Sequence, residues 1–211
     1  DEMWKKAADF GLLQVGYPEE FGGISEGIDQ HYVNIVSEEL GRIGSAGGIA
    51  STLLVHGIGL PPVVNFATQA IKEQVVPAVL AGEKRISLGI TEPSGGSDVA
   101  NLTTTARREG DFYIVNGSKT FISGGMGAHW ISTAVRTGDA GGGGISMLLI
   151  PTDLAGVSRT PLDKKQGWWC SDTATIYFDN VKVPVDHLIG EEGQGFLVIL
   201  NNFNSERLAM I

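Results

Sequence analysis

The hydrophobic pattern divides the chain into a helical first part and a strand-rich second part. Up to about Gly82, apolar residues recur at the spacing of helices that bury one face. Asp29 is a residue type that caps helices, and Pro77 is expected to kink or shorten the last helix. The predicted helices cover residues 1–14, 29–42, 45–58 and 66–80.

The period changes after residue 85. Short apolar runs follow one another, and residues 109–111 (Glu-Gly-Asp) between two of them are a hairpin signal. In the last run, Ala174, Ile176 and Phe178 alternate with Thr and Tyr, as in a strand with one buried face. Many short strands with Gly and Pro turns predict a sandwich or a small barrel. The predicted strands cover residues 86–91, 103–108, 112–115, 119–123, 130–136, 145–150 and 173–178.

Helical spacing returns from about Gly193, through Phe196, Leu200 and Phe203. The order of helices, then strands, then a helix predicts an α+β protein rather than alternating βαβ units. We therefore expect a helical domain over residues 1–85, a β domain over residues 86–190 and a second helical segment over residues 191–211.

Charge and composition narrow the classes of function. The net charge is -9 and the pI is near 4.8, and no basic stripe of the kind that nucleic acids require is visible. Cys170 is the only cysteine, so no disulfide forms within the chain, a reducing compartment is expected, and the residue is interpreted as small and packed. The four histidines lack metal-ligand spacing, and no apolar run is long enough to span a bilayer.

The segment from Leu88 to Asp98, LGITEPSGGSD, is the candidate site. Thr91 places a hydroxyl at the end of an apolar run. Gly95 and Gly96 allow backbone N–H groups to approach an anion, and Ser97 adds a second hydroxyl. From the spacing alone, an ordinary turn is the simpler interpretation, because Ser, Gly and Pro are common in loops.

Five segments in order are similar to motifs of the acyl-CoA dehydrogenase family, and the resemblance covers essentially the whole chain. They are PEEFGG (18–23), ITEPSGGSD (90–98), NGSKTFIS (116–123), VPVDHLIGEEGQGF (183–196) and NSERL (204–208). The resemblance implies an N-terminal all-helical domain, a central β-barrel-like domain that binds flavin, and a C-terminal helical bundle. Residues 191–211 would be the first part of that bundle.

The resemblance also implies a cofactor, FAD. The residues that would line the flavin are Leu88, Ile90, Thr91, Phe121, Ile122 and Ser123, and Ser97 would contact the pyrophosphate and lie near the substrate thioester. Phe121 stands where many members have Trp, and Ser123 where many have Thr; both changes keep the chemical type. No metal is implied.

The implied reaction is α,β-dehydrogenation of an acyl-CoA thioester to the trans-2-enoyl-CoA. A carboxylate removes the α-proton and the β-hydrogen leaves as hydride to the flavin. In most members the base is a Glu beyond the position of Ile211, whereas in a minority it occupies the position of Glu206. A surface ion pair is the alternative role for Glu206. Asn204 and Arg207 match positions that contact CoA or the acyl chain.

The resemblance further implies an electron-transferring flavoprotein as partner, a homodimer or homotetramer, and the bacterial cytoplasm or the mitochondrial matrix as location, the former preferred. Two alternatives remain open. One is an acyl-CoA oxidase or flavin monooxygenase of the same fold, and the other is a non-catalytic protein that binds acyl-CoA or flavin.

Overall fold

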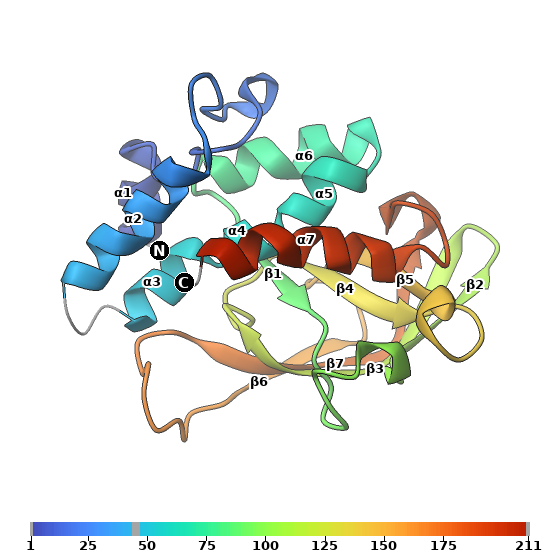
Figure 1. Ribbon diagram of the computed structural model, residues 1–211. Coiled ribbons are helices and arrows are strands. Elements are labelled where there is room, and N and C mark those ends of the chain that lie inside the picture. The colour runs from blue at the N-terminus through green and yellow to red at the C-terminus, as the bar shows by residue number, and fades with distance from the viewer. Residues whose placement is uncertain (1, 44–46, 210–211) are drawn as a thin grey trace.

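The computed structural model contains helices on one side of a bent sheet (Figure 1). It describes residues 2–43 and 47–209, apart from the side chains of residues 30, 33 and 205–209. The helices are α1 (Glu2–Asp9), α2 (Gln30–Arg42), α3 (Gly47–Leu54), α4 (His56–Gly59), α5 (Pro61–Phe66), α6 (Gln69–Leu80) and α7 (Gly195–Ala209). The strands are β1 (Ile86–Gly89), β2 (Thr105–Glu109), β3 (Phe112–Ser123), β4 (Trp130–Arg136), β5 (Ile145–Pro151), β6 (Val157–Pro161), β7 (Thr173–Pro184) and β8 (Leu188–Ile189).

The sheet consists of two halves joined at a corner. Its order is β6-β7-β3-β2-β4-β5-β8, with β1 paired in parallel to β4. The link between β2 and β4 is a single residue pair, Thr105 with Arg136, so the chain of hydrogen bonds nearly breaks there. The predicted β-barrel-like domain is therefore an open sheet rather than a closed barrel, because β6 and β8 at its ends do not pair with each other.

The half-sheet that contains β4 and β5 is buried on both faces. Ile145, Met147 and Leu149 of β5 belong to the apolar core that includes α5, α6 and α7, whereas Leu148 and Ile150 belong to the core shared with β3 and β7. Successive side chains of a strand point to opposite faces, so a strand between two layers is mostly apolar on both faces. Residues 145–150 are accordingly apolar except for Ser146, whose buried hydroxyl is hydrogen-bonded to the Thr137 hydroxyl and accepts the Gly193 amide.

The outer half-sheet has one buried face, as the alternation in β7 predicted. Ala174, Ile176 and Phe178 are buried, and Tyr177 between them is exposed. The predicted hairpin at residues 109–111 is also confirmed, since β2 and β3 pair antiparallel across it. Two runs predicted as separate strands, residues 112–115 and 119–123, form the single strand β3.

The predicted helix over residues 45–58 is wrong in its continuity, because the chain forms two short helices there, α3 and α4, and a third, α5, follows (residues 44–46 lie outside the described part). Pro61 starts α5, a position where the missing N–H of proline has no helical partner to lose. Gly59 lies against β1, where a Cβ atom would come within 2.9 Å of the Ser87 backbone. The glycine thus brings α4 onto β1. Cys170 is exposed rather than packed, which contradicts its predicted burial.

Helix α6 continues through Pro77 to Leu80, so the proline does not shorten it. Proline removes the hydrogen bond to the carbonyl four residues earlier, which belongs to Glu73. Both Pro77 and Glu73 are exposed, so water can replace that bond.

His56 is a buried ring at the junction of the helices. It packs between Trp4 and Tyr17, and its Nδ1 and Nε2 atoms lie 3.0 and 3.2 Å from the carbonyl oxygens of Leu53 and Leu13. A neutral imidazole donates only one hydrogen bond, so it satisfies one of these two carbonyls. Burial nevertheless lowers the pKa of His56 to about 4, although both carbonyls oppose that shift. His56 is therefore neutral at physiological pH.

This neutral histidine should make the fold sensitive to acid. The unfolded chain takes up the His56 proton near pH 6.5 and the folded protein only near pH 4, so stability is lost as the pH falls between those values. The loss amounts to about 3 kcal/mol. Urea unfolding between pH 7 and pH 4 should show a shallower pH dependence in His56→Gln than in the wild type. The exposed His31→Gln is the control; equal slopes for the wild type and H56Q would contradict this assignment.

Candidate functional site

A hollow lies where the end of β1, the end of β3, α4 and α7 meet, and we refer to it as the cradle hollow. Its volume is about 200 Å³. The residues that line it are Ile58, Leu88, Ile90, Thr91, Gly96, Phe121, Ile122, Ser123 and Phe203. Six of these are the predicted flavin contacts, so folding brings two segments about thirty residues apart in the sequence into one concave surface.

The wall formed by β3 contains a bulge. Lys119 pairs with Ile176 and Ile122 pairs with Ala174, so two residues of β3, Thr120 and Phe121, face a single residue of β7. Phe121 has a positive φ of 58°, which is an outlier for a bulky residue, and it is 68% exposed. The bulge thus turns an aromatic ring out of the sheet alternation and toward the hollow.

The two walls of the cradle hollow are not joined by a strand ladder. β1 pairs with β4, and β3 pairs with β2 and β7. Two individual hydrogen bonds link the walls instead: the Thr120 amide donates to the Thr91 carbonyl at 2.9 Å, and the Ser87 hydroxyl donates to the Ser123 carbonyl at 2.9 Å.

A buried ion pair forms the third link. The side chains of Lys119 and Glu92 are 0% and 2% exposed, and Nζ lies 2.8 Å from Oε1 of Glu92 and 3.1 Å from the Ile90 carbonyl. Glu92 also accepts hydrogen bonds from the Thr103 amide and hydroxyl, both at 2.6 Å, and from the Thr104 amide at 2.8 Å. The charges are therefore surrounded by partners, as buried charges require.

The two pKa values shift for different reasons. Burial would raise the pKa of Glu92, but hydrogen bonds from Lys119 and Thr103 outweigh it and hold the value well below its usual range. Burial lowers the pKa of Lys119 to about 8, although Glu92 opposes this shift. The first shift favours the ionised pair and the second disfavours it. Because the hydrogen bonds to Glu92 stabilise its carboxylate, and the pKa of Lys119 stays above 7, both groups are charged at neutral pH.

Sequence reasoning missed four residues of this site. Lys119 and Glu92 stood inside the quoted motifs, and a charged residue in an otherwise buried strand is the signal that could have found them. Phe203 had been noted only as part of a helical pattern. Ile58 gave no signal, because an apolar residue in an apolar segment looks the same whether it faces a core or a hollow.

The other predicted site residues are not gathered into the hollow. Ser97 and Asn204 are exposed and do not line it, although Ser97 adjoins Gly96 and Asn204 adjoins Phe203, which do. The side chains of Glu206 and Arg207, both in α7, lie outside the described residues.

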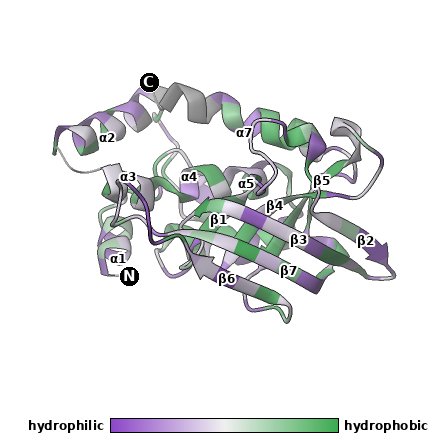
Figure 2. Ribbon diagram, turned by 90° about the horizontal axis from the view of Figure 1, so that it is seen from below, coloured by the Kyte–Doolittle hydropathy of each residue, from purple (hydrophilic) through white to green (hydrophobic). Residues whose placement is uncertain are grey.

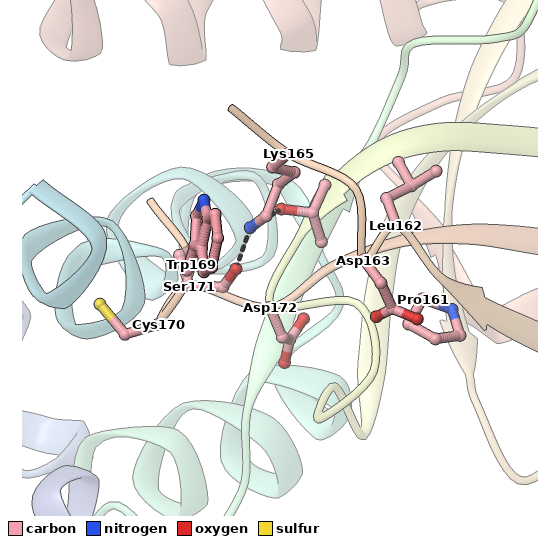
Figure 3. A pocket seen from close by; sticks show the side chains of 9 residues that line it. Pro161, Leu162, Asp163, Lys165, Trp169, Cys170, Ser171 and Asp172 are labelled. Carbon is pink, nitrogen blue, oxygen red and sulfur yellow. Dashed lines mark hydrogen bonds between the residues drawn. The ribbon is translucent and has the colours of Figure 1, made fainter. Parts of the chain in front are cut away.

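A second hollow, of about 310 Å³, lies beside the loop between β6 and β7 (Figure 3). Lys165 is the cationic residue that lines it. Its ammonium group donates hydrogen bonds to the carbonyls of Trp168 and Ser171 and to the Thr173 hydroxyl. The Asp172 carboxylate accepts the amides of Met126 and Gly127. Lys165 and Asp172 thus shape the loop at this hollow, whereas Lys119 and Glu92 link the walls of the cradle hollow from behind.

Among the described residues, no group of three or more His, Cys, Asp or Glu side chains is arranged to hold a metal ion. None of the described helices is by itself long and apolar enough to cross a membrane. Residues 47–54 and 56–66, which are bent relative to each other, are together long and apolar enough, judged by length and composition alone.

Two family models match the chain. Residues 1–83 match the acyl-CoA dehydrogenase N-terminal domain, and residues 87–181 match the acyl-CoA dehydrogenase middle domain.

Curated proteins and solved structures are similar over most of the chain. Acyl-CoA dehydrogenase AFT10-1 of Alternaria alternata is 44% identical over 85% of this chain and 41% of its own length. The mitochondrial isobutyryl-CoA dehydrogenase of Dictyostelium discoideum is 34% identical over 98% of this chain and 49% of its own. The acyl-CoA dehydrogenase of Bacillus anthracis, solved with FAD, is 35% identical with a TM-score of 0.89, over 98% of this chain and 35% of its own. The chain spans about half the length or less of these relatives.

The conformation of Phe121 predicts an unusual order of stabilities. A non-glycine residue at positive φ costs roughly 1–2 kcal/mol, and glycine avoids that cost. Thermal unfolding should therefore show Phe121→Gly to be more stable than Phe121→Ala by about 1 kcal/mol. Phe112, an exposed phenylalanine in the same strand with no positive φ, is the control, where the alanine variant should be the more stable. The same order at both positions would contradict a strained Phe121.

Proposed function

The chain belongs to the acyl-CoA dehydrogenase family, and from that premise we propose that the protein catalyses the FAD-dependent α,β-dehydrogenation of an acyl-CoA thioester to the trans-2-enoyl-CoA. The observation that carries the proposal is the cradle hollow. Six residues that the resemblance assigns to the flavin, from two segments of the chain, line it together. One similar solved structure, from Bacillus anthracis, is named as a complex with FAD.

The lining of the hollow fits part of a flavin. Its volume of about 200 Å³ is below the roughly 300–1,000 Å³ of whole-ligand pockets, so it suits one planar ring system rather than a dinucleotide. Leu88, Ile90 and Ile122 offer apolar surface, and Phe121 offers an exposed aromatic ring. Thr91 and Ser123 add hydroxyls for the polar edge of the ring.

The phosphate part of FAD would extend along the loop after Thr91, where Ser97 is exposed next to Gly96. Bound FAD supplies the acceptor for two electrons and the β-hydrogen of the substrate. The chain's own contribution is to orient that acceptor. The bulge in β3 presents Phe121 and Ser123 on one side, and the end of β1 presents Thr91 on the other.

Removal of the α-proton requires a carboxylate in a water-poor site, because this proton is too weakly acidic for a carboxylate in water. Ile58 and Phe203, from α4 and α7, form the apolar wall opposite the strands and would exclude water. Glu206 is the candidate base within this chain. It follows Phe203 by three residues, which is the spacing of neighbours on one helix face. Asn204 and Arg207 are proposed to contact CoA or the acyl chain.

We further propose that the electrons pass to an electron-transferring flavoprotein and that the protein assembles as a homodimer or homotetramer. Similar proteins occur in bacteria and in mitochondria, so the bacterial cytoplasm, or the mitochondrial matrix, is the proposed location.

The proposal predicts a coloured protein whose flavin is reduced by its substrate. Purified full-length protein should bind FAD, and a panel of straight and branched acyl-CoAs added without oxygen should bleach its visible absorption. Removal of one hydroxyl from the cradle, as in Ser123→Ala, should weaken FAD binding about three- to tenfold, the usual cost of one neutral hydrogen bond. Ser118→Ala, in the same strand but away from the hollow, should bind FAD like the wild type.

A colourless protein that takes up no added FAD would refute the proposed enzymatic activity. Bleaching followed by rapid reoxidation in air with peroxide formation would instead favour the oxidase alternative. Bleaching that is reversed by an electron-transferring flavoprotein supports the dehydrogenase.

A further inference from the structure

We propose that the Lys119–Glu92 ion pair fixes the separation of the two walls of the cradle hollow and is thereby a positioning element for the flavin. The inference rests on the proposed function, because it concerns the group expected in that hollow. It assigns a role to two residues that do not line the hollow at all.

The first argument comes from topology. A ladder of hydrogen bonds holds neighbouring strands at a fixed spacing. β1 and β3 lack such a ladder among the described strands, since β1 pairs with β4. The spacing of Thr91 from the bulge at Phe121 therefore depends on separate side-chain and backbone links.

The second argument comes from the position of the charges. The Lys119 ammonium bonds to the carbonyl of Ile90 and the carboxylate of Glu92, the residues on either side of Thr91. Lys119 itself immediately precedes Thr120 and Phe121, the bulged residues of the other wall. One buried side chain thus bridges the two walls directly behind the residues that face the hollow.

The third argument comes from energetics. A buried ion pair contributes little net stability, because desolvation of both charges offsets their attraction, and apolar replacements of both partners are often neutral. Removal of one partner is costly, because it leaves the other charge buried and unpaired. A role limited to stability would thus be met equally well by apolar residues. A charged pair with five hydrogen bonds, by contrast, defines a distance and a direction.

A double-mutant cycle on the full-length protein tests this role. The variants are Glu92→Gln, Lys119→Met and the two combined, and the measurements are thermal unfolding, the dissociation constant of FAD and the visible spectrum of the bound flavin. Each single variant should lose thermal stability. The double variant should recover most of it, yet bind FAD at least tenfold more weakly than the wild type and with a shifted flavin spectrum.

The control is the ion pair between Arg107 and Glu109, which is exposed in β2 of the same sheet. Glu109→Gln combined with Arg107→Met should change neither stability nor FAD binding. Recovery of both stability and FAD binding in the E92Q/K119M double variant would overturn the inference, because the pair would then be dispensable for position.

A second measurement separates this inference from the proposed function. Hydrogen exchange of the Thr120 amide, which donates to the Thr91 carbonyl, should be at least tenfold faster in the double variant, with or without flavin. If the wild type binds no FAD, the proposed function fails, and unchanged Thr120 exchange would still overturn the positioning role. Should the double variant not fold, Thr103→Val removes one hydroxyl that holds Glu92 and should show the same changes at smaller size.

Discussion

Two opposite charges that are buried away from water, Lys119 and Glu92, connect the parts of the chain on which the candidate site depends. The cost of burying them is met by a complete set of partners, which include the Ile90 carbonyl and the amides of Thr103 and Thr104. Ile90 directly follows β1, Thr103 and Thr104 directly precede β2, and Lys119 itself lies in β3. The loop, the strand end and the bulge must therefore adopt one arrangement together, because any other would leave a charge without a partner.

The layered core explains why the cradle hollow lies where it does. β4 and β5 are covered on one face by α5, α6 and α7 and on the other by β3 and β7. β1 pairs with β4 and lies at the boundary between the helical layer and the outer strands. Figure 2 shows α4 and α5 between α7 and the strands. Side chains from both helices and strands meet at such a boundary, so a concave, mostly apolar surface forms there.

Strain and burial at this site follow a common logic. Phe121 keeps a backbone conformation that disfavours phenylalanine, and its ring remains exposed, so neither stability nor core packing accounts for it. The ion pair behind it is similarly a weak source of stability. Features that cost stability are expected where a fold holds a reactive group. Trp168, in the loop beside the hollow near Lys165, also has a positive φ, so the buried ion pair behind Phe121 is what distinguishes the cradle hollow.

The sequence by itself determined the order of helices and strands and the buried face of β7, because these follow from local spacing and residue type. The two segments that carry Thr91 and Phe121 were identified by their resemblance to family motifs, since spacing alone favoured an ordinary turn. The sequence did not determine that residues 45–58 break into short helices, that the sheet stays open, or that Ile58 and Phe203 complete the hollow. Those features depend on contacts between segments far apart in the chain, such as Gly59 against Ser87 and Lys119 against Glu92. Only the tertiary structure decided them, since the energy of a buried charge or a close backbone contact depends on partners that local sequence does not specify.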